Sequence, residues 1–247
     1  MSESPRPTGN PARQNVTFSS AVATAHGHLA LPPSGRGPGV IVIQEWWGLT
    51  DHIADVTGRL AAEGFVALAP DLYGGNVAHD PEEALRLMRD LPVERGVELL
   101  SGAVDYLLGR PEVTSETVGA VGFCMGGGFV LYLAAKEPRV GAAVPFYGVI
   151  QGDLPDFSHL RADILGHYGE RDESIPPESL AALRHAIKEQ SGVDADLRTY
   201  PAGHAFFNDG RPEAYDPQAS REAWRSTVDF LHRELTGKLN GQVGMAK

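Results

Sequence analysis

Apolar residues in this chain alternate between short continuous runs and longer segments in which they recur every three or four positions. The run Val-Ile-Val-Ile at 40–43 is typical of a strand that is covered on both faces. In the following segment Ile53, Val56 and Leu60 lie on one helical stripe, which Gly64 ends. The pattern therefore predicts a buried strand followed by an amphipathic helix.

The same alternation continues along the chain. Further strands are predicted at 65–69, 118–121, 140–146, 164–168 and 197–200, and further helices around 93–107, 180–187 and 223–235. Residues 15–20 and 26–31 are expected to pair as an antiparallel hairpin at the edge of the sheet. Strand–helix alternation indicates an α/β fold, in which a mostly parallel central sheet carries helices on both faces. Ligands of such sheets bind beyond the carboxyl ends of the strands, so we expect functional residues directly after each strand.

The length and the absence of repeats or linkers predict a single domain. The chain has 247 residues, which suits one α/β domain. We expect this domain to span 15–236, between a disordered arm at 1–14 and a flexible tail at 237–247. Residues 1–14 lack the apolar stretch of a signal peptide, and no apolar run is long enough to span a bilayer.

The balance of charged residues limits the classes of molecule that the chain is expected to bind. Lys and Arg total 21 against 32 Asp and Glu, which gives a formal net charge of -11. Nucleic-acid binding needs clustered basic side chains, so this balance argues against it and, more weakly, against anionic membrane surfaces. A single cysteine rules out an internal disulfide and fits a reducing compartment. We therefore expect a cytoplasmic protein, a monomer or small homo-oligomer, that acts on a small molecule.

The segment Gly-Phe-Cys-Met-Gly at 122–126 directly follows a predicted strand and opens a helix. Its Gly-x-Cys-x-Gly pattern is typical of a nucleophile on a tight, strained turn, where flanking side chains would collide. We predict that Cys124 is the nucleophile and that the backbone N–H of Met125 stabilises an oxyanion. The alternative is that Cys124 is a small buried residue beside packing glycines. No Gly-x-Ser-x-Gly occurs that would offer a competing serine, and the glycines lack the spacing of a dinucleotide site.

A general base and an orienting acid are expected after the last two strands. His204 follows the strand at 197–200, where the order nucleophile, acid, base would place it, although it is alternatively an ordinary loop histidine. Asp172 follows the strand at 164–168, and Glu170 and Glu173 beside it are more typical of solvated loop charges. We predict that Asp172 fixes the tautomer of the base. The pair His26 and His28 has no third ligand nearby, so no metal site is predicted.

Gln-Glu-Trp-Trp-Gly at 44–48 ends the first long strand. The backbone N–H of Trp46 is the expected second oxyanion donor. Glu45 would face the pocket, where an unpaired carboxylate costs several kcal/mol. Trp46 and Trp47 can be core aromatics or pocket walls, and we expect one of each.

These segments together resemble the dienelactone hydrolase family. The resemblance rests on Gln44-Glu45-x-x-Gly48, Ala69-Pro70-Asp71-Leu72-Tyr73, Gly122-x-Cys124-x-Gly126-Gly127 and Ala202-Gly203-His204, and it runs from about 38 to 235. It implies an α/β-hydrolase fold, a triad of Cys124, His204 and Asp172, and no cofactor. It also implies that Glu45 keeps the cysteine as a thiol until bound substrate turns the carboxylate to take the proton.

Substrate recognition departs from the family pattern. Members that open dienelactone hold its carboxylate with two arginines, one in a lid and one four residues after the histidine. Here the second position is Asn208, and the segment 74–90 offers Arg86 and Arg89 without clear register. Both arginines can equally be surface helix residues. We expect substrate contacts from Trp47, Tyr73, Arg86, Phe206 and Asn208.

The leading hypothesis is thiol-dependent hydrolysis of a small ester or lactone. In this hypothesis Cys124 forms an acyl-enzyme, and His204, oriented by Asp172, activates the water that releases it. The alternative is a non-catalytic ligand-binding or thiol-sensing protein on the same fold. A binding protein has no need for a base and an acid in this order, so the triad argues against the alternative.

Overall fold

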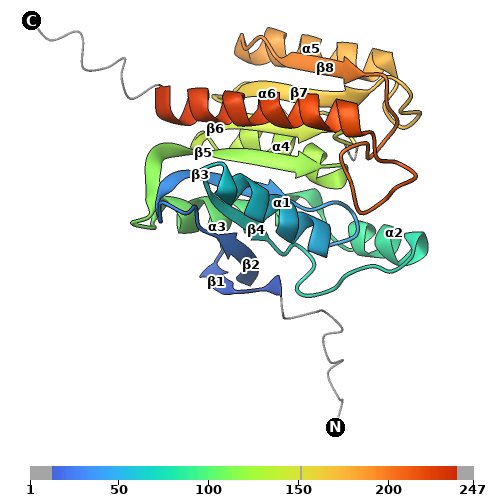
Figure 1. Ribbon diagram of the computed structural model, residues 1–247. Coiled ribbons are helices and arrows are strands. Elements are labelled where there is room, and N and C mark those ends of the chain that lie inside the picture. The colour runs from blue at the N-terminus through green and yellow to red at the C-terminus, as the bar shows by residue number, and fades with distance from the viewer. Residues whose placement is uncertain (1–12, 151, 238–247) are drawn as a thin grey trace, which may run out of the picture.

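A computed structural model describes residues 13–150 and 152–237 and contains one eight-stranded sheet flanked by helices (Figure 1). The strands follow the order β1-β2-β4-β3-β5-β6-β7-β8; the pairs β1–β2 and β2–β4 are antiparallel, and the other pairs are parallel. The strands are β1 (Val16–Ser19), β2 (Thr24–Ala30), β3 (Gly37–Ile43), β4 (Val66–Pro70), β5 (Val113–Phe123), β6 (Val140–Phe146), β7 (Asp163–Gly169) and β8 (Asp196–Tyr200). The helices are α1 (Asp51–Ala62), α2 (Pro81–Arg89), α3 (Val93–Leu108), α4 (Met125–Lys136), α5 (Pro177–Ser191) and α6 (Pro217–Thr236).

Helices cover both faces of the sheet, as the alternating pattern predicts. In Figure 1, α1 and α6 lie in front of the strands, and α3 and α4 lie behind them. Every residue of β3, β4 and β6 is buried, which explains why these strands read as continuous apolar runs. This architecture is the α/β-hydrolase fold.

The register of the central strands brings three chain segments to one level. Ile43 of β3 pairs with Gly122 of β5, and Phe123 of β5 pairs with Phe146 of β6. All three strands are parallel, so their carboxyl ends lie at the same edge of the sheet. The residues that follow them, among them Glu45 and Cys124, are therefore brought to one place.

The predicted strands, helices and edge hairpin are confirmed, and the two largest shifts of a boundary are at the starts of β5 and α6. The strand predicted at 118–121 begins five residues earlier, where its positions are mostly polar. It pairs there because Gly37 lies opposite Val113 and the N–H of Gly39 donates to Ser115 Oγ at 3.1 Å. The closing helix predicted from 223 begins at Pro217, because the carboxylate of Asp216 caps its first turn.

The segment 74–90, expected as a lid, contains the helix α2. Asp80 is its N-cap and accepts from the N–H of Glu83 at 2.9 Å, and a proline stands in the first turn. Its buried residues are Ala84 and Leu87. With Met88, which is partly buried against the core, they form a short apolar stripe that is difficult to recognise from periodicity.

The last two residues of the predicted N-terminal arm lie against the domain. Gln14 Nε2 donates to Asp71 Oδ2 at 2.6 Å, and Arg13 pairs with Asp51. Residues 1–12 of the arm and 238–247 of the tail lie outside the described residues. Within the described part of the chain, no helix combines the length and apolarity that a bilayer crossing requires.

Candidate active site

Cys124 occupies the sharp turn between β5 and α4. Its backbone has φ 54° and ψ -117°, and Met125 is the first residue of α4. The N–H of Cys124 donates to the carbonyl of Phe146 at 3.1 Å, and its own carbonyl accepts from the N–H of Val149 at the same distance. These bonds to the neighbouring strand end hold a conformation that a non-glycine residue rarely adopts. The first N–H groups of α4 have no intrahelical acceptor, which favours negative charge beside the sulfur.

The glycines on either side of Cys124 are required by close backbone approach. A Cβ on Gly122 would lie 2.2 Å from the carbonyl oxygen of Gly126. A Cβ on Gly126 would lie 2.4 Å from the carbonyl oxygens of both Ile43 and Gln44. Only glycine permits these contacts, so the Gly-x-Cys-x-Gly pattern reflects how α4 packs against the end of β3.

Backbone strain is concentrated around this turn. Three non-glycine residues of the described chain have positive φ: Cys124, Tyr147 at 37° and Ala205 at 59°. Tyr147 directly follows β6, and Ala205 directly follows His204. Such conformations persist only where the surrounding structure holds them, and they cluster at functional sites.

His204 and Asp172 form the pair that the sequence predicts. His204 Nδ1 lies 2.6 Å from Asp172 Oδ2, and the side chain of Asp172 is only 1% exposed. The other carboxylate oxygen accepts from the N–H of Ser174 at 3.0 Å and from its hydroxyl at 2.5 Å. Glu170 and Glu173 are exposed. The geometry therefore distinguishes Asp172 from the two glutamates beside it.

Electrostatics favour an ionised acid and a protonated imidazole. Burial raises the pKa of Asp172, but hydrogen bonds from His204 and Ser174 outweigh it and leave that pKa below its ordinary value. Burial lowers the pKa of His204, but hydrogen bonds to Asp172 and Cys124 together with their charges raise that pKa to about 10. His204 therefore holds a proton at neutral pH while it contacts Cys124.

Glu45 is a buried carboxylate beside this pair, with an exposed fraction of 2%. Asn208 Nδ2 donates to Glu45 Oε2 at 2.7 Å, and Asn208 Oδ1 in turn accepts from the N–H of Gly210 at 3.0 Å. Burial raises the pKa of Glu45 to about 7, and the Asn208 hydrogen bond and the charges of His204 and Arg211 offset this only in part. A neutral amide is thus the hydrogen-bond partner of a carboxylate that changes charge near neutral pH.

One cavity connects these groups. It has a volume of about 560 Å³ and is lined by Glu45, Trp46, Trp47, Met88, Cys124, Met125, Val149, Arg171, Asp172, Glu173, Ser174, His204, Ala205 and Arg211. The nucleophile, the histidine, the acid and both residues expected to supply oxyanion N–H groups therefore border the same space. We call it the catalytic cavity.

Four of the five expected substrate contacts lie outside this lining. Arg86 is on α2, with Glu83 at 3.8 Å and Asp90 at 3.6 Å, beside a separate hollow, because it belongs to the solvated face of that helix. Phe206 is fully buried between Tyr147 and Tyr200 and is a core residue. The expectation of direct contact is corrected for both residues.

Tyr73 and Asn208 act on residues of the cavity rather than lining it. The hydroxyl of Tyr73 donates to Met125 Sδ at 3.2 Å, and Asn208 holds Glu45. Both tryptophans line the cavity, whereas one of them was expected in the core. The guanidinium of Arg211 lies 5.5 Å from the centroid of Trp47. Arg211 and Arg171 are thus the arginines of the cavity.

Sequence reasoning did not identify Ser174, Arg171, Met88 or Val149 as cavity residues. The spacing Asp-x-Ser, in which the serine N–H and hydroxyl return to the carboxylate, could have pointed to Ser174. Met88 and Val149 carry no local pattern that separates them from core residues. In the described ranges 13–150 and 152–237, no group of three His, Cys, Asp or Glu residues has the arrangement of a metal site.

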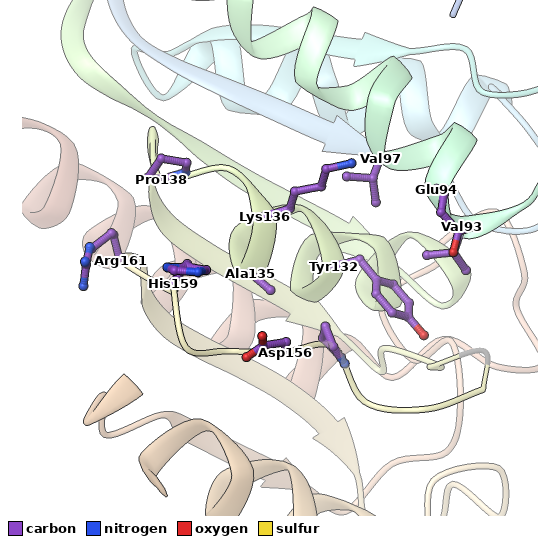
Figure 2. Close-up of a pocket in the computed structure, with 11 residues that line it drawn as sticks. Val93, Glu94, Val97, Tyr132, Ala135, Lys136, Pro138, Asp156, His159 and Arg161 are labelled. Atoms are coloured by element: carbon purple, nitrogen blue, oxygen red, sulfur yellow. The ribbon is translucent and has the colours of Figure 1, made fainter. Parts of the chain in front are cut away.

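A cavity of about 610 Å³ lies elsewhere, along α3, α4 and the segment before β7 (Figure 2). Figure 2 shows Arg161 and His159 at one end of it and Tyr132 nearer the other. None of its lining residues belongs to the Cys124, His204 and Asp172 group. The volume of a cavity therefore does not identify the candidate active site, whereas the reactive side chains that line it do.

Comparison with known proteins agrees with this geometry. The model of the dienelactone hydrolase family matches residues 25–235. The chain belongs to the dienelactone hydrolase family. Protein usf of Aquifex pyrophilus is 36% identical over 231 residues, covering 90% of this chain and 99% of that protein. Carboxymethylenebutenolidase of Pseudomonas sp. strain P51 is 33% identical over 216 residues, covering 83% and 89%.

Solved structures of dienelactone hydrolase type share the fold. A candidate dienelactone hydrolase from Klebsiella pneumoniae superposes with a TM-score of 0.80 at 30% identity, covering 88% of this chain and 96% of that one. The expected family is therefore confirmed, and membership supports a hydrolase that acts on a small molecule.

Proposed function

We propose that this dienelactone hydrolase family member cleaves a small carboxylic ester or lactone by nucleophilic attack of Cys124. The observation that carries the proposal is the shared cavity. Cys124 stands at a strained turn in its wall, and His204 in the same wall contacts both Cys124 and the buried Asp172. The carboxymethylenebutenolidase of Pseudomonas sp. supports an ester or lactone as the substrate class.

In the first half-reaction the Cys124 thiolate, whose proton has passed to Glu45, attacks the substrate carbonyl, and the carbonyl π electrons move to its oxygen. The backbone N–H groups of Met125 and Trp46 stabilise that oxyanion, each by about 3 kcal/mol. When the oxyanion collapses, the C–O bond to the alcohol breaks, and protonated His204 donates its proton to the departing oxygen. The products are a thioester on Cys124 and a neutral imidazole; from a lactone, the alcohol stays on the acyl chain.

In the second half-reaction neutral His204 takes a proton from water, whose oxygen attacks the thioester. Collapse of this second oxyanion breaks the C–S bond and releases the acid. Asp172 keeps the imidazole in the required tautomer and stabilises the imidazolium form in both halves. The sulfur leaves as a thiolate beside the protonated imidazole, and the return of the proton from Glu45 to sulfur restores the starting arrangement.

Glu45 is proposed as the group that controls where the thiol proton resides before substrate binds. Its buried position and its pKa of about 7 support this role, because a carboxyl with that pKa can both accept and release a proton at neutral pH. The family resemblance suggests the direction of transfer, from Cys124 to Glu45 on substrate binding. This role of Glu45 is separate from that of the triad.

The proposal is tested by burst kinetics with 4-nitrophenyl acetate. We expect a rapid release of about one nitrophenolate per active site, followed by slower turnover, because acylation precedes hydrolysis of the thioester. Cys124→Ala should abolish both phases while the circular dichroism spectrum stays native. Activity of this variant within tenfold of the wild type would exclude the mechanism. A stoichiometric burst without turnover would instead favour a thiol-reactive binding protein.

A further inference from the structure

Asp71 is a buried carboxylate that does not line the catalytic cavity, and its exposed fraction is 6%. Its Oδ1 accepts from the N–H of Tyr73 at 3.0 Å. Its Oδ2 accepts from the N–H of Gly75 at 2.7 Å and from Gln14 Nε2 at 2.6 Å. Two of these bonds fold the backbone after β4 back onto the carboxylate, as aspartates do in tight turns. We call residues 71–78, which this turn begins, the β4 loop.

The β4 loop binds the segment after β3 on both sides of one proposed oxyanion donor. The N–H of Leu72 donates to Gln44 Oε1 at 3.2 Å, and the N–H of Ala78 donates to the carbonyl of Trp47 at 2.9 Å. Trp46, whose N–H is that donor, stands between Gln44 and Trp47 in the chain. Hydrogen bonds from the two ends of the loop therefore fix the segment that carries this N–H.

Gly48 brings the same two segments into direct backbone contact. It pairs with Val77 in an antiparallel bridge and has a φ of 100°. A Cβ at this position would lie 2.6 Å from the carbonyl oxygen of Asn76. Glycine is therefore required both by the positive φ and by the close approach of the β4 loop. Because the backbones touch, a displacement of the loop would displace the segment after β3.

The β4 loop also holds the other proposed oxyanion donor. The hydroxyl of Tyr73 donates to Met125 Sδ at 3.2 Å, and Met125 is the first residue of α4, next to Cys124. Asn76 Nδ2 donates to the carbonyl of Tyr73 at 2.8 Å, and Asp71 accepts from the N–H of Tyr73. The loop thus fixes the backbone of Tyr73, and the side chain of Tyr73 fixes Met125.

We propose that Asp71 is a positioning residue of the active site, which fixes the β4 loop and through it both oxyanion donors. Asp71 does not touch the substrate, and it acts through the turn that its carboxylate closes. Donors stabilise an oxyanion strongly only when they are fixed before the reaction, and a small misplacement costs much of the rate. The inference rests on the proposed function, because the oxyanion is the one that forms in ester or lactone cleavage.

Two reactions of Cys124 distinguish this role from a general effect on folding. Acylation by an ester places negative charge on the carbonyl oxygen, so its rate depends on the oxyanion donors. Alkylation by iodoacetamide displaces iodide from a saturated carbon and develops no oxyanion, so its rate reports only the ionisation and accessibility of the sulfur. Displaced donors should therefore slow the first reaction and leave the second unchanged.

The main variant is Asp71→Asn, whose amide keeps one acceptor oxygen but places N–H donors against the remaining N–H groups. We expect the rate constant of the nitrophenolate burst at saturating 4-nitrophenyl acetate to fall at least tenfold. The ester concentration that gives half of that rate should stay within threefold, and alkylation by iodoacetamide within twofold. Asp80→Asn is the matched control and should change none of these values beyond twofold. Asp80 caps α2 outside the β4 loop, and asparagine caps a helix equally well.

Tyr73→Phe is a second variant, which keeps the ring and the turn and removes only the hydroxyl contact with Met125. Its burst rate constant should fall at least threefold while alkylation stays within twofold. A folded Asp71→Asn with a burst rate within twofold of wild type, or equal losses of acylation and alkylation in either variant, would overturn the proposal. If Asp71→Asn does not fold, the same two results in Tyr73→Phe decide.

1,1,1-Trifluoroacetone separates this inference from the proposed function. Its carbonyl carbon bonds to the sulfur of Cys124, the thiol proton passes to Glu45, and the carbonyl π electrons move to oxygen. The adduct therefore carries an oxyanion but has no leaving group. The ketone should protect wild-type Cys124 from iodoacetamide, and Asp71→Asn should need at least tenfold more of it. If that shift occurs but no ester is hydrolysed, the positioning role stands and the hydrolase proposal fails. If esters are hydrolysed but Asp71→Asn keeps both the burst rate and the protection, the positioning role fails alone.

Discussion

At the residue scale, two carboxyl groups with different electrostatic environments share one cavity. Asp172 is buried but well hydrogen-bonded, and Glu45 is buried and accepts a hydrogen bond from the neutral side chain of Asn208. The pKa of the first carboxyl is therefore lowered, whereas burial raises that of the second to about 7. Environments that separate the pKa values of two acids are typical of sites where one acid orients a base and the other exchanges a proton.

Asp172→Asn tests the choice of acid. The amide keeps the size of the side chain but loses its charge and can hold the wrong imidazole tautomer, so kcat should fall by about a thousandfold or more. Glu173→Gln and Glu170→Gln, which change exposed neighbours of the same loop, should each stay within threefold of wild type. Steady-state kinetics with one good ester would measure all three. If Glu173→Gln lost more activity than Asp172→Asn, the acid would have to be reassigned.

Glu45→Gln tests control of the thiol proton through two measurements that should move in opposite directions. A carboxylate in the same cavity repels a thiolate, so we expect slow alkylation of the unliganded wild type by iodoacetamide at neutral pH. Removing that charge should speed alkylation, whereas loss of the proton acceptor should slow acylation by an ester.

One alkylation result would contradict this role of Glu45. Rapid alkylation of the unliganded wild type below pH 6, unchanged in Glu45→Gln, would indicate a preformed ion pair between Cys124 and His204. The raised pKa of His204 supports such a pair, so the experiment decides between two arrangements of the same proton.

At the element scale, the site depends on how closely α4 approaches the ends of β3 and β6. The run Gly126-Gly127-Gly128 opens this helix, and a Cβ on Gly128 would lie 2.1 Å from the carbonyl oxygen of Val149. Helix propensity alone would disfavour three successive glycines by about 1 kcal/mol each. Their presence indicates that backbone contact outweighs propensity at this position.

Gly126→Ala should therefore destabilise the protein, by about 2 kcal/mol, because the added methyl group would overlap backbone that cannot move aside. The turn at Cys124 would shift with it, and kcat should fall at least tenfold. Gly58→Ala is the matched control, since this exposed glycine of α1 has open space around it and alanine there should stabilise by about 0.5–1 kcal/mol. Urea unfolding of both variants would check the opposite signs.

Elements with a long apolar period could be predicted from the sequence, and elements held by polar contacts could not. The runs at 40–43 and 140–146 gave their strands directly, because both faces of those strands are covered. The helix α2 depends on its N-cap, and the first half of β5 depends on the contact of Ser115 with the neighbouring strand. Neither feature produces a periodic pattern of apolar residues in the sequence. The proximity of Cys124, Asp172 and His204 could be predicted because each of these residues follows its own strand. The lining of the cavity could not, because packing that sequence order does not encode places Arg86 and Phe206 away from it.

At the scale of the whole molecule, the buried Glu45 links catalysis to stability. Its ordinary pKa of 4.5 applies to the unfolded chain, and its pKa in the folded protein is about 7. Between these values the folded state keeps a proton that the unfolded state has released. The free energy of unfolding should therefore fall as pH rises from about 4.5 to 7, by ~3 kcal/mol from this residue.

Glu45→Gln removes this ionisation and should be more stable than wild type at pH 8, by about 3 kcal/mol, and within ~1 kcal/mol of it at pH 4.5. Thermal or urea unfolding at the two pH values would measure the difference. Glu116→Gln, at an exposed position of β5, is the control and should show the same small difference at both. An advantage of Glu45→Gln that did not grow with pH would mean that Glu45 does not change charge in this interval.

The position of Cys124 has a further consequence for oxidative stress. Its sulfur borders an open cavity, so once substrate binding has drawn off the thiol proton, the thiolate is open to peroxide, which oxidises it to a sulfenic acid. The chain contains no second cysteine, so no internal thiol is available to convert that product into a disulfide. Recovery then requires a small thiol that fits the catalytic cavity, and oxidation beyond the sulfenic stage inactivates the molecule permanently.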